Sequence, residues 1–139
     1  LAKLAAELQI ADRVTVLGYV SRARVMDLME ASDLFTFPSV SETQGMVVLE
    51  SMARGTPVIA ADAMGPGQMM KGDRGGWLTK ANDVEDFAAK VLAAVHDGPA
   101  RERKAADARL LASEYAAEGI NATLAGFYAE ALAGKSSRG

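Results

Sequence analysis

Two glutamates with seven residues between them, Glu42 and Glu50, stand in a stretch that predicts a loop followed by a helix. Gly45 opens the predicted helix, and Gly55 ends it because glycine tolerates the left-handed backbone that follows many helices. The residues between these glycines are mostly apolar, so we expect the helix to be buried on most sides. Glu50 is then a carboxylate in apolar surroundings, and it needs hydrogen-bond donors.

This arrangement suits a ligand that carries phosphates and hydroxyl groups. The backbone N–H groups of Gly45, Met46 and Val47 lie at the helix start, where they lack helical partners and carry partial positive charge. Glu50 lies about one and a half turns into the helix, where the hydroxyls of a ribose are suitable donors to its carboxylate. Glu42, just before the helix, is placed to accept from the hydroxyls of a sugar beyond the phosphates.

A structural interpretation fits the same spacing equally well. Glu50 and Arg54 are four residues apart, so they can form an ion pair on an exposed face of the helix. Glu42 then serves only to stabilise the start of the helix through its charge. Both interpretations stay open on spacing alone.

Strands and helices alternate along the rest of the chain. This alternation predicts an α/β fold with a Rossmann-like, mostly parallel sheet and flanking helices. The predicted strands are Val14–Leu17, Asp33–Pro38, Val58–Ala61 and Gly76–Thr79. The predicted helices cover residues 1–8, 22–31, 45–54, 82–96, 100–117 and 120–132, with a short helical turn at 68–70.

Composition indicates a globular domain and excludes several classes of function. The chain has 139 residues, of which 50% are hydrophobic and 24% charged, enough for one domain with a core. Its net charge of −3 gives no electrostatic case for nucleic acid or an anionic membrane surface. It contains no cysteine, hence no disulfide framework and no thiolate metal site. We expect a cytoplasmic protein, or one attached peripherally to the inner face of the membrane.

The run from Pro38 to Glu50, followed by Ser51 to Ala60, resembles the E-x7-E region of the retaining glycosyltransferases of family GT4, which have the GT-B architecture. The similarity extends from Asp12 to about Leu132. It implies that residues 1–133 are the C-terminal, donor-binding domain of a GT-B enzyme, truncated at its N-terminal side, and that residues 134–139 are a flexible tail. The variant Glu-Thr-Gln-Gly at the first glutamate resembles some lipid and polysaccharide glycosyltransferases.

The resemblance implies transfer of a sugar, with retention, from a nucleotide-diphosphate donor such as a UDP- or GDP-sugar to a hydroxyl acceptor on a glycan, lipid or small molecule. Glu42 would be the catalytic residue, either orienting the donor sugar or acting covalently. The donor-binding residues would be Glu50, Gly45, Met46 and Val47, with Tyr19 and Val20 near the base. A structural alternative for Tyr19 is packing over the sheet edge.

The family pattern also implies parts that this sequence lacks. These are the N-terminal acceptor domain and an arginine and a lysine that neutralise the diphosphate, so we expect the 139 residues alone to transfer sugar poorly. Gln68 stands where the family often has an acid, which leaves the donor sugar open. No Asp-x-Asp pair is present, so we expect no metal and no cofactor beyond the donor.

Other functions and structural roles compete with this interpretation. Two carboxylates at a sugar also suit a glycosidase, and a nucleotide-sugar epimerase or a non-catalytic nucleotide-binding module shares the architecture. His96, in the last turn of its helix, suits the helix dipole better than catalysis. The cluster of Arg101, Arg103 and Lys104 predicts a solvated face. Met64, Met69 and Met70 are expected to fill gaps in the core.

Overall fold

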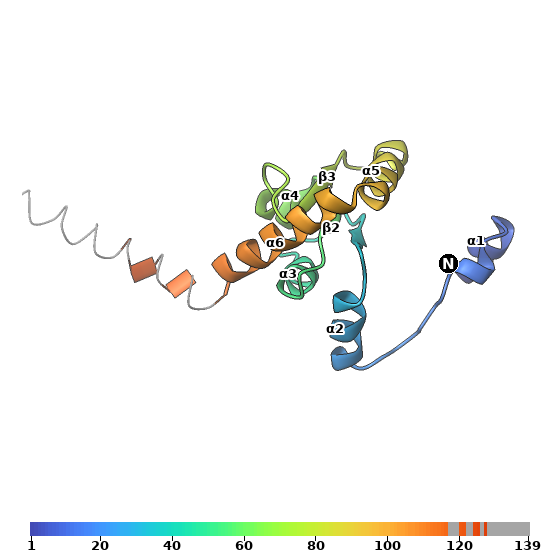
Figure 1. Ribbon diagram of the computed structural model, residues 1–139, viewed down its shortest axis with the longest axis horizontal. Coiled ribbons are helices and arrows are strands. Elements are labelled where there is room, and N and C mark those ends of the chain that lie inside the picture. Colours follow the sequence, from blue (N-terminus) through green and yellow to red (C-terminus); the bar gives the residue numbers. More distant parts are fainter. Residues whose placement is uncertain (117–119, 122–123, 126, 128–139) are drawn as a thin grey trace, which may run out of the picture.

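Three parallel strands form one sheet in the order β1-β2-β3 (Figure 1). The computed structural model describes residues 1–116, 120–121, 124–125 and 127. In chain order the elements are α1 (Ala2–Glu7), η1 (Ala11–Arg13), α2 (Arg22–Glu30), β1 (Phe35–Phe37), α3 (Met46–Ala53), β2 (Val58–Ala61), α4 (Met64–Met69), β3 (Gly76–Thr79), α5 (Val84–His96) and α6 (Gly98–Glu114). This confirms the predicted α/β class and three of the four predicted strands.

The middle strand, β2, is buried along its whole length. It has a hydrogen-bonded strand on each side, and α3 and α5 lie on opposite faces of the sheet (Figure 1). A strand covered in this way must be apolar on both faces, which explains the uninterrupted sequence Val-Ile-Ala-Ala. The carboxyl ends of β1 and β2 lead into the segments that precede α3 and α4.

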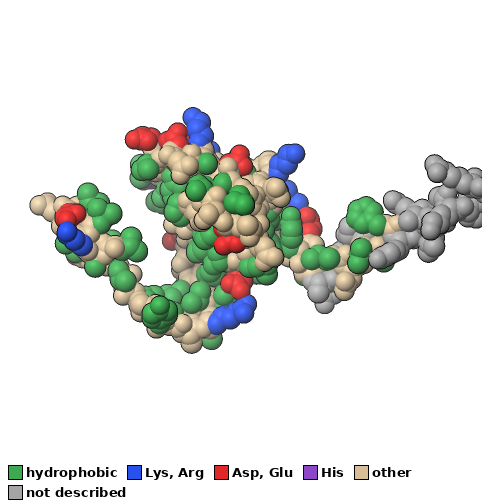
Figure 2. Space-filling model, turned by 180° about the vertical axis from the view of Figure 1, so that it is seen from behind, with side chains coloured by type: hydrophobic (Ala, Val, Ile, Leu, Met, Phe, Trp, Pro, Cys, Tyr) green, Lys and Arg blue, Asp and Glu red, His purple; other side chains and the backbone are tan. Residues whose placement is uncertain are grey.

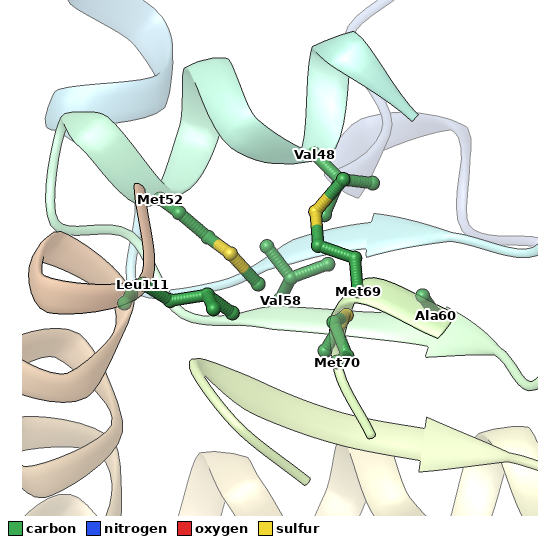
Figure 3. Packing of buried hydrophobic residues seen from close by; sticks show 8 residues of the cluster. Val48, Met52, Val58, Ala60, Met69, Met70 and Leu111 are labelled. Carbon is green, nitrogen blue, oxygen red and sulfur yellow. The ribbon is translucent and has the colours of Figure 1, made fainter. Parts of the chain in front are cut away.

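The hydrophobic core lies between α3, the sheet and α6 (Figure 3). Met52 of α3 is fully buried, and the sequence prediction that α3 faces the interior is confirmed for the part of the helix that carries Val48 and Met52. Met69 and Met70 also belong to the core, as expected, whereas Met64 is half exposed. Packing of α6 against α3 and β3 therefore closes one side of the core.

Polar caps and one glycine define the ends of the helices as predicted. The Ser21 hydroxyl accepts a hydrogen bond from the Arg24 N–H at 3.3 Å, and α2 begins directly after Ser21. Asp83 caps α5 in the same way, and His96 lies in the last turn of that helix. Gly55 follows α3 with a φ of +80°, the left-handed conformation expected of it.

The prediction of a strand at Val14–Leu17 is wrong. The segment is extended but pairs with no strand of the described chain, and it runs from α1 to α2 away from the sheet (Figure 1). Val16 and Leu17 are 58% and 49% exposed. Alternating apolar residues favour a strand only where a neighbouring strand supplies the hydrogen bonds. Apolar side chains accordingly lie open along this N-terminal arm (Figure 2).

The prediction of a solvated basic face on α6 is wrong for two of its three residues. Arg101 donates to the backbone carbonyls of Ala94 and Val95, at 2.7 and 2.5 Å, and so joins α6 to the end of α5. Lys104 donates to the carbonyl of Asp73 and lies over the Trp77 ring.

The predicted last helix and the tail at 134–139 lie largely outside the described residues. Among the residues that are described, no helix has both the length and the apolar character needed to cross a membrane.

Truncation of Met52 tests the assignment of the core. Met52→Ala removes a side chain with no exposed surface, so we expect the free energy of unfolding to fall by about 2–5 kcal/mol. Met46→Ala is the matched control on the same helix, because Met46 is 56% exposed, and should change stability by less than about 1 kcal/mol. Urea denaturation measures both, and equal losses in the two variants would contradict this core.

Candidate functional site

The start of α3 is formed by a glycine in the left-handed conformation. Gly45 precedes the helix with a φ of 69°, which confirms the predicted helix start. The next two N–H groups, of Met46 and Val47, donate no hydrogen bond to any residue of the described chain. The backbone therefore presents two free donors at the positive end of a partly buried helix, a geometry that attracts an anion.

The Glu42 carboxylate folds back onto the turn that leads into this helix. Its Oε1 accepts from the backbone N–H groups of Gln44 at 3.1 Å and Gly45 at 3.2 Å. These hydrogen bonds stabilise the charged form and hold the pKa of the Glu42 carboxyl below its ordinary value. Glu42 thus stabilises the start of the helix, as one of the two interpretations expected. Its carboxylate does not bind the N–H groups of Met46 and Val47, which stay free for a ligand.

Glu50 meets an arginine from a different helix. Its side chain is 27% exposed, and Oε1 lies 2.5 Å from Nη2 of Arg22, the first residue of α2. The alternative pairing of Glu50 with Arg54 is wrong, because Arg54 binds Glu30 on α2 with a separation of 3.2 Å. The two helices are therefore joined by two ion pairs of opposite polarity, one at each end of α2.

The segment that carries Tyr19 and Val20 leads directly into α2. The Tyr19 side chain is fully exposed and Val20 is partly so, which excludes packing of Tyr19 over the edge of the described sheet. Because residues 14–17 form no strand, this segment does not follow a strand end as predicted. The chain connection to Arg22 keeps this segment near the Arg22–Glu50 pair. Contact of Tyr19 and Val20 with the nucleotide base remains a prediction.

Gly65 lets α4 come close to the loop before α3, and Gly67 lets the same helix lie against Asp62, which directly follows β2. A Cβ on Gly65 would lie 2.4 Å from the Thr43 carbonyl oxygen, and one on Gly67 would lie 2.5 Å from Asp62 Oδ1. The Gly65 N–H donates to the Glu42 carbonyl at 3.2 Å, which ties the loop to α4. Gln68 lines an open cavity of about 370 Å³ beside this contact, together with Asp62 and Lys71.

Sequence reasoning missed Arg22. It lies 28 residues from Glu50, and no helical or strand spacing connects positions so far apart. The only local signal was the Ser21 cap, which placed Arg22 at the start of a helix without indicating its partner. Among the described residues, no group of three or more His, Cys, Asp or Glu side chains is arranged to hold a metal ion.

Comparison with known proteins matches residues 1–124 to the family described as Glycosyl transferases group 1. The chain belongs to this family. A D-inositol 3-phosphate glycosyltransferase of Rhodococcus opacus is 42% identical over 101 residues, which cover 73% of this chain and 22% of that protein. Its counterpart from Stackebrandtia nassauensis is 36% identical over 129 residues, 93% of this chain and 29% of that protein.

Solved structures of glycosyltransferases with the GT-B architecture share the fold. Sucrose-phosphate synthase of Thermosynechococcus elongatus superposes with a TM-score of 0.79 at 25% identity, over 95% of this chain and 33% of that one. HepE of Anabaena, solved in complex with UDP, gives a TM-score of 0.79 at 28% identity, over 92% of this chain and 35% of that one. The chain thus spans between 22% and 35% of the length of these proteins.

The hydrogen bonds to Glu42 predict a measurable dependence of stability on pH. Its pKa is lowered from 4.5 in the folded state, so its stabilisation is complete above that value and is lost as the pH falls through the folded-state pKa. We expect Glu42→Gln to have a lower free energy of unfolding than the unmodified chain at neutral pH. The difference between the two free energies should shrink in acid. NMR titration of the Glu42 carboxyl gives the pKa directly, and a value at or above 4.5 would contradict these hydrogen bonds.

Proposed function

We propose that the start of α3 binds the nucleotide diphosphate of a sugar donor. The observation that carries the proposal is the combination, on one short helix, of two free N–H groups at Met46 and Val47 with the half-buried carboxylate of Glu50 one turn further on. The two free N–H groups suit an anion, and the Glu50 carboxylate suits neighbouring hydroxyl groups. A nucleoside diphosphate has both, with the ribose hydroxyls on one side of the phosphates.

We propose that the protein containing this chain transfers a glycosyl group, with retention, to a hydroxyl acceptor on a glycan, lipid or small molecule. The bond between the anomeric carbon and the diphosphate oxygen breaks, a bond to the acceptor oxygen forms, and the proton of the acceptor hydroxyl passes to the leaving diphosphate or to water. Charge then develops on the leaving diphosphate, where the N–H groups of Met46 and Val47 would stabilise it.

Glu42 is proposed as the catalytic residue that orients the donor sugar. Its Oε1 is held by two backbone N–H groups, while Oε2 accepts no hydrogen bond from the described residues. A carboxylate fixed by one oxygen presents the other in a defined direction, which suits binding of sugar hydroxyls. The hydrogen bonds that lower its pKa favour the charged carboxylate, so it would act as an acceptor of hydrogen bonds and not as a proton donor.

A nucleotide titration tests the donor site. We expect UDP, which the related HepE was solved with, to shift the amide resonances of Gly45, Met46 and Val47 in the NMR spectrum of this chain. Glu50→Ala should weaken the affinity by about tenfold or more, because it removes a charged hydrogen-bond acceptor for the ribose. Glu102→Ala removes an exposed carboxylate on α6 and serves as the control. Equal affinities for both variants would contradict the proposed role of Glu50.

Turnover by the protein that contains this chain tests the reaction. We expect a transferred sugar whose anomeric configuration matches the donor, and activity that survives a metal chelator. Glu42→Gln should lower kcat by at least about tenfold with a smaller change in KM, since its proposed contact strengthens as the donor bond breaks. Inversion, an epimerised free donor, or nucleotide binding without turnover would each contradict retaining transfer and favour a different GT-B function.

A further inference from the structure

Arg22 lies between the segment expected to contact the base and the helix proposed to bind the diphosphate and ribose. Only Ser21 separates it from Val20, and its guanidinium contacts Glu50 at 2.5 Å. We infer that Arg22 is a positioning residue that holds the Glu50 carboxylate in the orientation that accepts the ribose hydroxyls. This inference rests on the proposed function, and it adds a residue from α2 to a site otherwise built on α3.

The contact between the two side chains leaves half of the carboxylate free. Arg22 Nη2 contacts Oε1 of Glu50, and Oε2 accepts no hydrogen bond from the described residues. A bidentate arginine would occupy both oxygens and compete with a ligand, whereas this contact fixes one oxygen and leaves the other available. The Glu50 side chain is 27% exposed and the Arg22 side chain 80%, so the pair lies where a ligand can reach the carboxylate.

An anchor for Glu50 matters because its neighbours supply none. Most residues of α3 around it are apolar, and within the described chain Arg22 is the one charged group that contacts its carboxylate. A glutamate side chain that is free to rotate loses conformational entropy when it binds a ligand. A partner that orders the carboxylate beforehand removes part of this cost, so the binding of hydroxyl groups becomes tighter.

The position of α2 does not depend on Arg22 alone. The Thr56 hydroxyl, which is buried, donates to the Met29 carbonyl at 2.5 Å, and Arg54 binds Glu30 at the other end of α2. Loss of the Arg22 side chain should therefore leave α2 docked on α3. The Arg54–Glu30 pair also provides a matched control, since it joins the same two helices outside the proposed site.

Calorimetric titration of the protein that contains this chain, with UDP and with 2′,3′-dideoxy-UDP, tests the inference. We expect Arg22→Ala to weaken UDP binding by about threefold to tenfold and to leave dideoxy-UDP binding unchanged, because an effect exerted through Glu50 requires the ribose hydroxyls. Arg22→Lys should restore part of the UDP affinity. Arg54→Ala should bind both nucleotides as the unmodified chain does. In the background of Glu50→Gln, removal of Arg22 should add little to the loss.

Three results would overturn the role of Arg22 while leaving the donor site intact. These are unchanged or tighter UDP binding by Arg22→Ala, an equal loss for both nucleotides, and full additivity with Glu50→Gln. Absence of UDP binding by the unmodified protein that contains this chain, with a folded circular dichroism spectrum, would instead overturn the proposed donor site and this inference together.

Discussion

The close approach of α4 to the loop before α3 is the constraint on which the candidate site depends. Gly65 lies so near Thr43 that any side chain at this position would collide with the backbone, and its N–H fixes the carbonyl of Glu42. With the loop held from this side, Gly45 adopts its left-handed conformation and α3 begins at Met46. The direction of the two free N–H groups is therefore set by backbone packing between β2, α4 and the loop, and not by a flexible side chain.

The two glutamates are satisfied in different ways, which supports different roles. Glu42 is held by backbone N–H groups of its own loop, so its orientation follows from the fold of that loop. Glu50 is held by an arginine of another helix, so its orientation depends on how α2 packs against α3. A change in the packing of α2 would move Glu50 while leaving Glu42 in place. This separation fits one carboxylate at the reacting sugar and another at the nucleotide.

Most of the fold could be predicted because its signals are local. The apolar run of β2, the Ser21 and Asp83 caps and Gly55 each follow from a few consecutive residues. The same patterns failed at Val14–Leu17, where strand formation depends on a neighbour that a local pattern does not reveal. Pairing of charges was also beyond local reasoning. Arg54 binds Glu30, far along the chain, where spacing within one helix suggested Glu50. Lys104, expected on a solvated face, donates to the backbone carbonyl of Asp73.

The central claim is that a nucleoside diphosphate binds at the start of α3, and a crystal structure of this chain with UDP tests it most directly. The account predicts phosphate oxygens within hydrogen-bond distance of the N–H groups of Met46 and Val47, and ribose hydroxyls on the Glu50 carboxylate with Arg22 still in contact. UDP bound at another part of the sheet, with the start of α3 unoccupied, would contradict it.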